Sequence, residues 1–378
     1  MKTIFISIPW FVPAFKAGGP IQSIANMVYE LNEGYRFYIY TSNTDLHGLP
    51  IAVAITNEWV EYNAHTKVWY ANKKNRSQQL VDQVKSIKPD QLFIIGLFNW
   101  HFNIVPMLYA ACADKLVSVR GMLHPGALGQ KGLKKKLFLK AMQWMKLDRK
   151  CRFHATDEAE AGYIKNILGP HVQVAVAGNF PRLFPLQEPV EKEAGTLQLI
   201  SVGIISPMKN YLRVIEALAG MRAVVRYTIY GPVKEPAYWE QCLEAIKALP
   251  ANITVQYHPE LPAHKVAAKL TGEQVFILPS KSENYGHAIA EALSAGLPVI
   301  SSHAVPWLAL KGNNAGVNVD MEAGDAGIAA LAEAMDFFAA MGQEEYDSWR
   351  RGAAAYVRKR VNREELVAAY DRMFGGER

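Results

Sequence analysis

Short apolar runs rich in β-branched and aromatic residues recur along almost the whole chain, and they constrain its fold more than any other feature. The runs in the first half are residues 3–8, 36–42, 66–71, 91–97, 115–121, 152–157 and 172–178. Those in the second half are residues 197–203, 224–231, 252–258, 274–280, 297–302 and 315–320. Helix-like segments, such as 20–31 and 77–87, lie between them. Strands that are apolar on both faces are typical of parallel sheets covered by helices on both sides, so the pattern predicts an α/β fold.

The stretch from Gly178 to Gly195 interrupts this alternation with prolines and mixed charge, which is typical of a linker. A length of 378 residues also exceeds one ordinary domain. We therefore expect two Rossmann-like domains, at 1–180 and 196–361, joined by a linker at 181–195. The amphipathic C-terminal segment, about 362–378, is expected to pack back on the first domain. Ligands of such open sheets bind beyond the carboxyl ends of the strands, so the cleft between the domains is the expected site.

The composition and the short motifs exclude several classes of protein. No stretch reaches the roughly 18 apolar residues that span a bilayer, and the apolar run at 3–8 is expected to be a buried strand rather than a signal peptide. Cys112, Cys151 and Cys242 are far apart and lack zinc spacing, so free thiols in a reducing cytoplasm are expected. No G-x-G-x-x-G follows a predicted strand and no P-loop motif is present, which disfavours dinucleotide oxidoreductases and P-loop hydrolases.

The stretch KSENYGHAIAEALSAGLPVIS, residues 281–301, places two carboxylates around one glycine. The run at 274–280 predicts a buried strand, Gly286 allows the turn that follows, and a helix is expected from about His287. Glu283 then lies just ahead of the helix N-terminus, where backbone N–H groups favour anions, and Glu291 lies inside the helix. Free N–H donors for phosphate and carboxylates for hydroxyls suit a sugar nucleotide. The alternative is a capping carboxylate followed by an exposed helical glutamate.

This stretch resembles the E-x7-E signature of the retaining glycosyltransferases of family four (glycosyl transferases group 1), which have the GT-B fold of two Rossmann-like domains with parallel sheets facing a cleft. The likeness extends to the E-A-L-x-A-G-x-P-V run and to the strand before it. The resemblance implies that Glu283 contacts hydroxyls of the donor sugar and that Glu291 binds the ribose of the nucleotide. Asn284, Tyr285 and Gly286 would offer backbone N–H groups to the sugar and the phosphates.

Two further segments resemble the donor-binding parts of the same family. In FKAGGPIQSIANMVYEL, Gly18 and Gly19 would lie near the donor phosphates, and two glycines before a helix let the backbone approach a ligand closely. In LISVGIISPMKNYLRVIEAL, Lys209 matches the lysine that grips the donor diphosphate. The family usually has an arginine directly after the glycine of this loop, where Ile204 stands here. Lys209 with backbone dipoles, or another basic residue such as Arg120, would have to replace it.

Polar residues at predicted strand ends of the first domain are candidates for contacting the reacting sugar or the acceptor. His101 follows one strand and Arg120 the next, and we expect one of these two to make that contact. His124, His154 and Glu158 occupy similar positions, although a histidine of this kind is more often a core residue. The segments SVRGMLHPGAL and HATDEAE resemble those of transferases that build bacterial surface polysaccharides.

A net charge of +6 favours anionic partners, and residues 131–150 concentrate basic side chains. Apolar residues repeat there at helical spacing with lysines between them: Leu133, Leu137, Phe138, Ala141, Met142 and Met145, and Lys134, Lys135, Lys136, Lys140 and Lys146. One reading is an interfacial helix on anionic lipid, where polyprenyl-linked acceptors reside. The other is an ordinary helix that packs on the sheet with a solvated basic face. Nucleic-acid binding is not expected, because Trp144 is the only stacking aromatic interleaved with these lysines.

The resemblance implies transfer of a sugar, with retention, from a UDP- or GDP-sugar to a hydroxyl of a saccharide or lipid-linked acceptor. It also implies no essential metal and no further cofactor. We expect a cytoplasmic protein, peripheral on the inner face of the membrane if the first reading of residues 131–150 holds, and the oligomeric state is left open. A sugar-nucleotide epimerase of the same fold is one alternative. A non-catalytic sugar-nucleotide-binding paralogue, motivated by Ile204, is the other.

Overall fold

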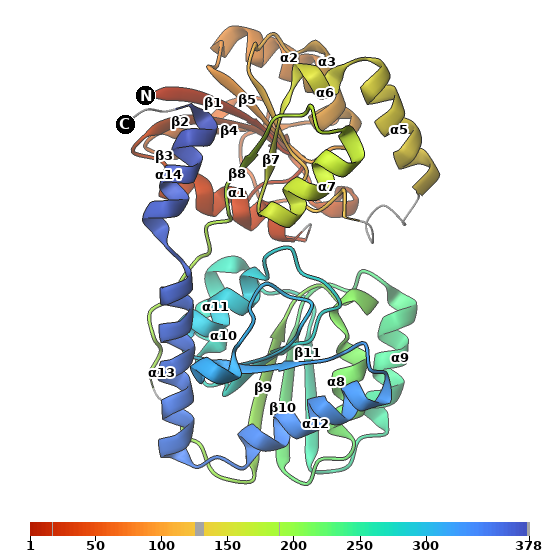
Figure 1. Cartoon of the computed structure of the whole chain (residues 1–378), viewed down its shortest axis with the longest axis vertical. Coiled ribbons are helices and arrows are strands. Elements are labelled where there is room, and N and C mark those ends of the chain that lie inside the picture. The colour runs from red at the N-terminus through yellow and green to blue at the C-terminus, as the bar shows by residue number, and fades with distance from the viewer. Residues whose placement is uncertain (17, 125–131, 189, 376–378) are drawn as a thin grey trace. The chain divides into compact units, whose positions relative to one another are not determined.

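The computed structural model describes residues 1–375 except residues 17, 125–131 and 189; the side chains of residues 132 and 133 are also left undescribed. The chain divides into two compact units, one formed by residues 1–180 with 363–378 and the other by residues 181–362 (Figure 1). Each unit is a sheet of parallel strands flanked by helices, and the α/β class predicted from the sequence is confirmed.

The sheet of the first unit has eight strands in the order β3-β4-β2-β1-β5-β6-β7-β8. Their bounds are β1 Lys2–Ser7, β2 Tyr35–Ser42, β3 Trp59–Asn63, β4 Thr66–Ala71, β5 Gln91–Ile95, β6 Lys115–Ser118, β7 Arg152–Ala155 and β8 Val174–Val176. All pairs are parallel except that of β3 with β4. The strand β3 was not predicted from the sequence, because this edge strand carries the exposed residues Glu61 and Tyr62 and so lacks the continuous apolar run of the inner strands.

Neighbouring residues of the inner strands pack into two different hydrophobic clusters, one on each face of the sheet. In β5, Leu92 and Ile94 belong to one cluster, whereas Phe93 and Ile95 belong to the other. Side chains alternate across a strand, so a strand that is buried on both faces needs an apolar residue at every position. This explains the continuous apolar runs of the sequence.

The helices of the first unit follow the strands. They are α1 Gly19–Glu30, η1 Leu46–Gly48, α2 Arg76–Ile87, η2 Trp100–Ile104, α3 Val105–Tyr109, α5 Gly132–Trp144, α6 Leu147–Lys150, α7 Glu158–Leu168 and α14 Arg363–Phe374. Within the described residues, every helix of the chain falls short of the length or the apolarity that crossing a bilayer requires.

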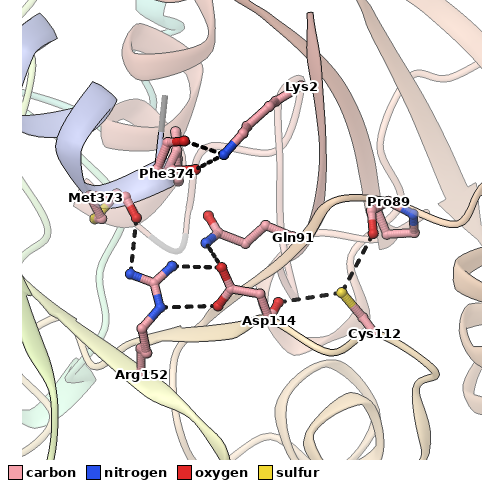
Figure 2. Close-up of polar contacts among 9 residues, drawn as sticks. Lys2, Pro89, Gln91, Cys112, Asp114, Arg152, Met373 and Phe374 are labelled. Atoms are coloured by element: carbon pink, nitrogen blue, oxygen red, sulfur yellow. Dashed lines mark hydrogen bonds and ion pairs between the residues drawn. The ribbon is translucent and has the colours of Figure 1, made fainter. Parts of the chain in front are cut away.

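The C-terminal helix α14 packs on the first unit through buried aromatic side chains and polar contacts. Tyr370 stacks on Phe180, with ring centroids 5.2 Å apart. Figure 2 shows Arg152 between Asp114 and the end of α14: its Nε and Nη2 donate to the Asp114 carboxylate at 3.0 and 2.7 Å, and its Nη1 donates to the backbone oxygen of Met373 at 3.1 Å. Because these contacts cap the last carbonyls of the helix, they fix its C-terminal end against the sheet.

Helix α5 forms within the predicted basic segment, and Phe138, Met142 and Met145 of the predicted apolar stripe pack on the core. Leu139 and Met142 are buried, whereas Leu137, placed on the stripe by the sequence, is 69% exposed. Trp144 lies two turns after Leu137 and is 85% exposed. The stripe assigned from spacing was therefore wrong at Leu137, because Leu139 rather than Leu137 meets the core together with Met142. Residue 131 and the side chain of Leu133 lie outside the described part.

The sheet of the second unit has six strands, all parallel, in the order β11-β10-β9-β12-β13-β14. The strands are β9 Thr196–Val202, β10 Val224–Tyr230, β11 Ile253–His258, β12 Val275–Leu278, β13 Val299–Ser302 and β14 Gly316–Val319. The helices are η3 Pro207–Lys209, α8 Tyr211–Leu218, α9 Pro236–Lys247, η4 Ala263–Lys265, α10 Val266–Leu270, α11 His287–Ala295, η5 Lys311–Asn313, α12 Asp325–Ala339 and α13 Gln343–Arg360. Figure 1 shows α8, α9 and α12 on one side of this sheet and α10, α11 and α13 on the other.

Residues 181–195, where the sequence suggests a linker, are held on the second unit. The backbone N–H of Phe184 donates to Ser294 Oγ at 2.8 Å, and that of Gln187 donates to the Ala295 carbonyl at 3.1 Å. Lys192 is buried and donates through Nζ to the carbonyls of Glu193, Thr196 and Ala339. This segment therefore packs on the second unit, with Lys192 buried in it.

Candidate functional site

The turn between β12 and α11 depends on Gly286. Its φ of +77° lies in the left-handed region, and a Cβ there would stand 3.2 Å from Ile289 Cδ1 and 3.4 Å from the ring of Trp307. The carbonyl of Gly286 accepts from the N–H groups of Ile289 and Ala290, which starts the helix at His287. The strand, turn and helix predicted from the sequence are therefore confirmed, and the positive end of α11 lies directly after the turn.

Glu283 lies in this turn and forms an ion pair with Lys209, whose Nζ meets its Oε1. Ser280 Oγ donates to the same carboxylate oxygen at 2.8 Å. Lys209 comes from η3, which follows β9, the strand paired with β12. The N–H of Lys281 also donates to the Met208 carbonyl at 2.8 Å, so the two strand-end loops are joined. A cation and an anion thus stand side by side at the carboxyl edge of the sheet.

Glu291 is buried in α11, with 6% of its surface exposed. Its Oε1 lies 3.1 Å from Arg182 Nη2. Burial raises the pKa of Glu291 to about 7, although the Arg182 guanidinium opposes this shift. The alternative reading of Glu291 as an exposed helical residue is therefore wrong, because the small neighbours Ala288 and Ala292 leave room for other elements to cover it.

Arg182 is the partner that the sequence analysis missed. Its Nη2 also donates to the Ala263 carbonyl at 3.0 Å, and its guanidinium lies over the Phe184 ring, 4.7 Å from the centroid. Its Nε is buried and has no hydrogen-bond partner among the described residues. A single arginine within a proline-rich stretch gives no periodic signal, so only the fold could join it to Glu291, 109 positions later.

The loop after β9 is fixed by close backbone contact. Gly203 O accepts from the Tyr211 hydroxyl at 2.9 Å, and a Cβ on Gly231 would come within 2.0 Å of the same oxygen. Ile204 is half-buried in this loop, and Lys209 is the single charged residue between 203 and 209. Any anion bound by this loop would therefore meet the charge of Lys209 and the backbone alone.

Gly18, Gly19, Arg120 and His101 lie on the first unit. Gly18 caps α1 with a φ of 83°, and Gly19 is the first residue of that helix. His101 Nδ1 is 2.6 Å from Ser77 Oγ, and its pKa is lowered by burial and by the nearby charge of Arg76.

Arg120 is 9% exposed and its Nη1 donates to Asn179 Oδ1. Its Nε and Nη2 are buried and have no hydrogen-bond partner among the described residues. Its backbone adopts the left-handed conformation, with a φ of 50°. Arg120 also lies close to Tyr370, where its charge opposes the rise in the Tyr370 pKa that burial causes.

Of two further strand-end candidates, His154 has a structural position in the core, whereas Glu158 lies at the surface. His154 is fully buried, with Nδ1 2.8 Å from Ser118 Oγ and Nε2 2.8 Å from the Ala177 carbonyl. Burial, together with the charge of Arg120, lowers the pKa of His154 to about 3, so the ring is neutral and donates from Nε2. Glu158 is exposed on α7.

Glu160, two positions after Glu158, is the buried carboxylate of this region. It accepts from the N–H groups of Gly121 and Thr156 and from the Thr156 hydroxyl. Glu160 therefore ties the loop after β6 to the loop after β7. No group of three or more His, Cys, Asp and Glu side chains suited to a metal ion occurs in the described part of the chain.

Residues 184–351 match the family model described as glycosyl transferases group 1. This range contains Lys209, Glu283 and Glu291 and stays within the second unit. Among curated proteins, no sequence matches this chain.

Solved structures match along nearly the entire length. Sucrose-phosphate synthase from Thermosynechococcus elongatus is 15% identical, with a TM-score of 0.69 over 98% of both chains. HepE from Anabaena, in complex with UDP and glucose, is 14% identical, with a TM-score of 0.67 over 99% of this chain and 100% of its own. WaaG, a glycosyltransferase involved in lipopolysaccharide biosynthesis, is 13% identical, with a TM-score of 0.64 over 99% and 100%.

At these identities the likeness to solved structures concerns the fold, whereas the family match concerns the sequence of the second unit. Both agree with the resemblance that the sequence itself carries at residues 281–301. The chain therefore has the GT-B fold, and residues 184–351 of its second unit match the family model of the glycosyl transferases group 1.

Proposed function

We propose that this protein transfers a sugar, with retention, from a UDP- or GDP-sugar to a hydroxyl of a saccharide or lipid-linked acceptor in cell-surface polysaccharide synthesis. The observation that carries the proposal is the Lys209–Glu283 pair beside the N-terminus of α11. A cation and helix N–H groups suit a diphosphate, and a carboxylate suits sugar hydroxyls. The complexes of HepE with UDP and with UDP-glucose, and the role of WaaG in lipopolysaccharide synthesis, support the donor class and the pathway by analogy.

In this proposal each donor-side residue has one role. Glu283 positions the sugar, and the N–H groups of Asn284, Tyr285 and Gly286 bind the sugar and the phosphates. Glu291 accepts hydrogen bonds from the ribose. Gly18 and Gly19 would approach the phosphates from the first unit, and His101 or Arg120 would contact the reacting sugar or the acceptor.

Lys209 and the positive end of α11 would offset the charge that develops on the leaving diphosphate. This is the role that a divalent cation has in metal-dependent transferases, so the proposed reaction requires no metal. A donor diphosphate would draw Lys209 away from Glu283, which frees that carboxylate for the sugar. Lys209 and Glu283 would thus pair with each other before the donor binds, and with the diphosphate and the sugar afterwards.

The proposal is tested by incubating the full chain with UDP-, GDP-, ADP- and CMP-sugars. The correct donor should raise the melting temperature, because it binds only the folded protein. Product analysis with a saccharide acceptor should then show a new glycosidic bond of the donor's own anomeric configuration. An epimerised sugar nucleotide, formed without acceptor, would instead support the epimerase alternative. Donor binding with no product would support a non-catalytic protein.

We also propose that α5 attaches the protein to the inner, anionic face of the cytoplasmic membrane. Leu137 and Trp144 are exposed on this helix, and Lys134, Lys136 and Lys140 are exposed beside them. Exposed apolar side chains flanked by lysines suit the boundary between headgroups and acyl chains. Each lysine near an anionic surface contributes about 1 kcal/mol.

The double variant Leu137→Gln with Trp144→Ser is expected to lose most of its binding to vesicles that contain anionic lipid. Both side chains are already exposed, so folding should be retained. Flotation of the full chain at low salt measures the bound fraction. Tyr109→Ser, which removes a 64%-exposed aromatic residue from α3, is the matched control. Equal flotation of the wild type and the double variant would rule out this role of α5.

A further inference from the structure

A pocket of about 360 Å³ opens at the carboxyl edge of the sheet in the first unit. Its lining follows four strands: Trp10 follows β1, Asn43 follows β2, Lys73 follows β4 and Asn99 follows β5. β1 pairs with β2 on one side and with β5 on the other, so the pocket lies where the chain order of the sheet reverses. Open parallel sheets bind ligands at this point.

The single carboxylate that lines the pocket is already used by the protein. Asp45 is 3% exposed, and its Oδ2 accepts from the N–H groups of Phe15 and Lys16 at 2.9 and 3.0 Å. Its Oδ1 accepts from the N–H of Leu46 at 2.7 Å. These bonds hold the loop after β1 to the loop after β2. Asp45 therefore uses both oxygens on the backbone, and within the described residues it forms no ion pair with Lys73 or Arg76.

Arg76 lines the pocket with a charge that the protein leaves unbalanced. Its guanidinium lies over the Phe102 ring, 5.5 Å from the centroid, and its buried Nε has no hydrogen-bond partner among the described residues. Within the same part of the chain, no carboxylate forms an ion pair with it. Burial lowers the pKa of Arg76, as expected for a cation that has lost water without gaining a counter-charge. An anion in the pocket would supply the missing partner.

The other polar groups at the pocket also point to an anionic ligand. The side-chain oxygen of Asn99, Oδ1, accepts from the backbone N–H groups of His101 and Phe102 at 3.0 and 3.1 Å, so the side-chain nitrogen Nδ2 remains as a donor. Lys73 is exposed at the rim and adds a second cation. Helix α2 begins at Arg76, which brings its positive end to the same place. Donors and positive charge thus dominate the pocket.

We propose that this pocket binds an acidic group, a phosphate or a carboxylate, carried by the acceptor saccharide, with Arg76 as its main partner. The volume suits one sugar residue with its acidic substituent, since ligand pockets typically start at about 300 Å³. Trp10 also lines the pocket and supplies an aromatic side chain beside the charged groups. That the bound saccharide is the acceptor depends on the proposed glycosyl transfer, whereas the binding of an acidic sugar in this pocket does not.

Calorimetry on the full chain tests the pocket with glucose 6-phosphate, glucuronate, glucose and inorganic phosphate at one ionic strength. Glucose 6-phosphate or glucuronate should bind more tightly than both glucose and inorganic phosphate, and the better of the two identifies the acidic group. Arg76→Gln should weaken that binding about tenfold or more, because a charge-assisted hydrogen bond is lost. Lys73→Gln should weaken it less, and Lys74→Gln, at an exposed lysine that does not line the pocket, should leave it unchanged.

Acidic sugars that bind no better than glucose or than inorganic phosphate would overturn the proposal. An equal loss in Lys74→Gln would overturn it as well. Melting temperatures show whether the variants fold. If Arg76→Gln does not fold, Lys73→Gln at the exposed rim still tests the proposal. The proposed function is tested separately. If the wild type binds the acidic sugar through Arg76 but transfers no sugar, the pocket proposal stands and the proposed glycosyl transfer is wrong.

Discussion

Replacing Glu291 by alanine should lower the free energy of unfolding by about 3 kcal/mol and remove measurable nucleotide binding. The stability loss follows because Arg182 would remain largely buried with no carboxylate to balance it, and breaking one side of a buried pair costs about 3–5 kcal/mol. Urea denaturation measures this loss. Glu333→Ala, an exposed glutamate of α12, is the control and should change stability by less than about 0.5 kcal/mol.

Glu291→Gln separates the charge of this residue from its packing. Glutamine keeps the volume and can still accept a hydrogen bond from Arg182, so it should fold better than the alanine variant. It cannot become a carboxylate, and the proposed ribose hydroxyls would lose a charged acceptor. Nucleotide affinity should therefore fall about tenfold or more at pH 8 in calorimetry. An unchanged affinity would contradict the ribose-binding role of Glu291.

The raised pKa of Glu291 gives this prediction a pH dependence. Ribose hydroxyls donate to the carboxylate, so nucleotide affinity in the wild type should rise as the pH increases through about 7, and this rise should be absent in Glu291→Gln. The free energy of unfolding measured without nucleotide should instead fall as the pH increases. A folded pKa above the ordinary 4.5 contributes stability that is full below pH 4.5 and is lost as the pH rises to about 7. The similarly raised pKa of Glu273 has the same effect in the wild type and in Glu291→Gln. The quantity to measure is therefore the difference between their two curves of unfolding free energy against pH.

The sequence predicted the parts of the fold that periodic patterns encode. The apolar runs identified every inner strand, because a strand buried on both faces must be apolar throughout. The edge strand β3 was missed for the same reason, since it carries the exposed residues Glu61 and Tyr62. The exposure of Leu137 on α5 was also missed. Leu137 and Leu139 are equally apolar, and only the shape of the surrounding core decides which of them is buried.

Contacts between distant segments limit how much of the candidate site can be predicted from the sequence. Local sequence motifs were sufficient to predict three of the site residues, Glu283, Glu291 and Lys209. Arg182 stands in none, and its pairing with Glu291 arises because residues 181–195 pack along α11. Glu160 likewise looked no different from its exposed neighbour Glu158 until the loops after β6 and β7 came together.

Lys209→Ala should reduce the rate of sugar transfer about 100-fold or more while the protein remains folded. Removing one preorganised donor from a developing negative charge typically costs a factor of about 10²–10³ in kcat. The effect should fall at the upper part of this range here, because the loop after β9 offers no second cation once Ile204 occupies the position of the family arginine. Lys281→Ala, in the adjoining loop, removes an exposed lysine and should leave kcat unchanged.

Binding measurements show whether Lys209 acts on the diphosphate or only shapes the site. Lys209→Ala should weaken the nucleoside diphosphate chosen by the donor panel at least tenfold, yet leave the affinity for its nucleoside unchanged. Lys209→Arg should recover part of the loss, since the charge is kept. The variant also releases Glu283 from its ion pair, but that carboxylate retains its hydrogen bond from Ser280. Equal weakening of the nucleoside and its diphosphate would mean that the pair with Glu283 is structural, and the phosphates would then depend on the N-terminus of α11 alone.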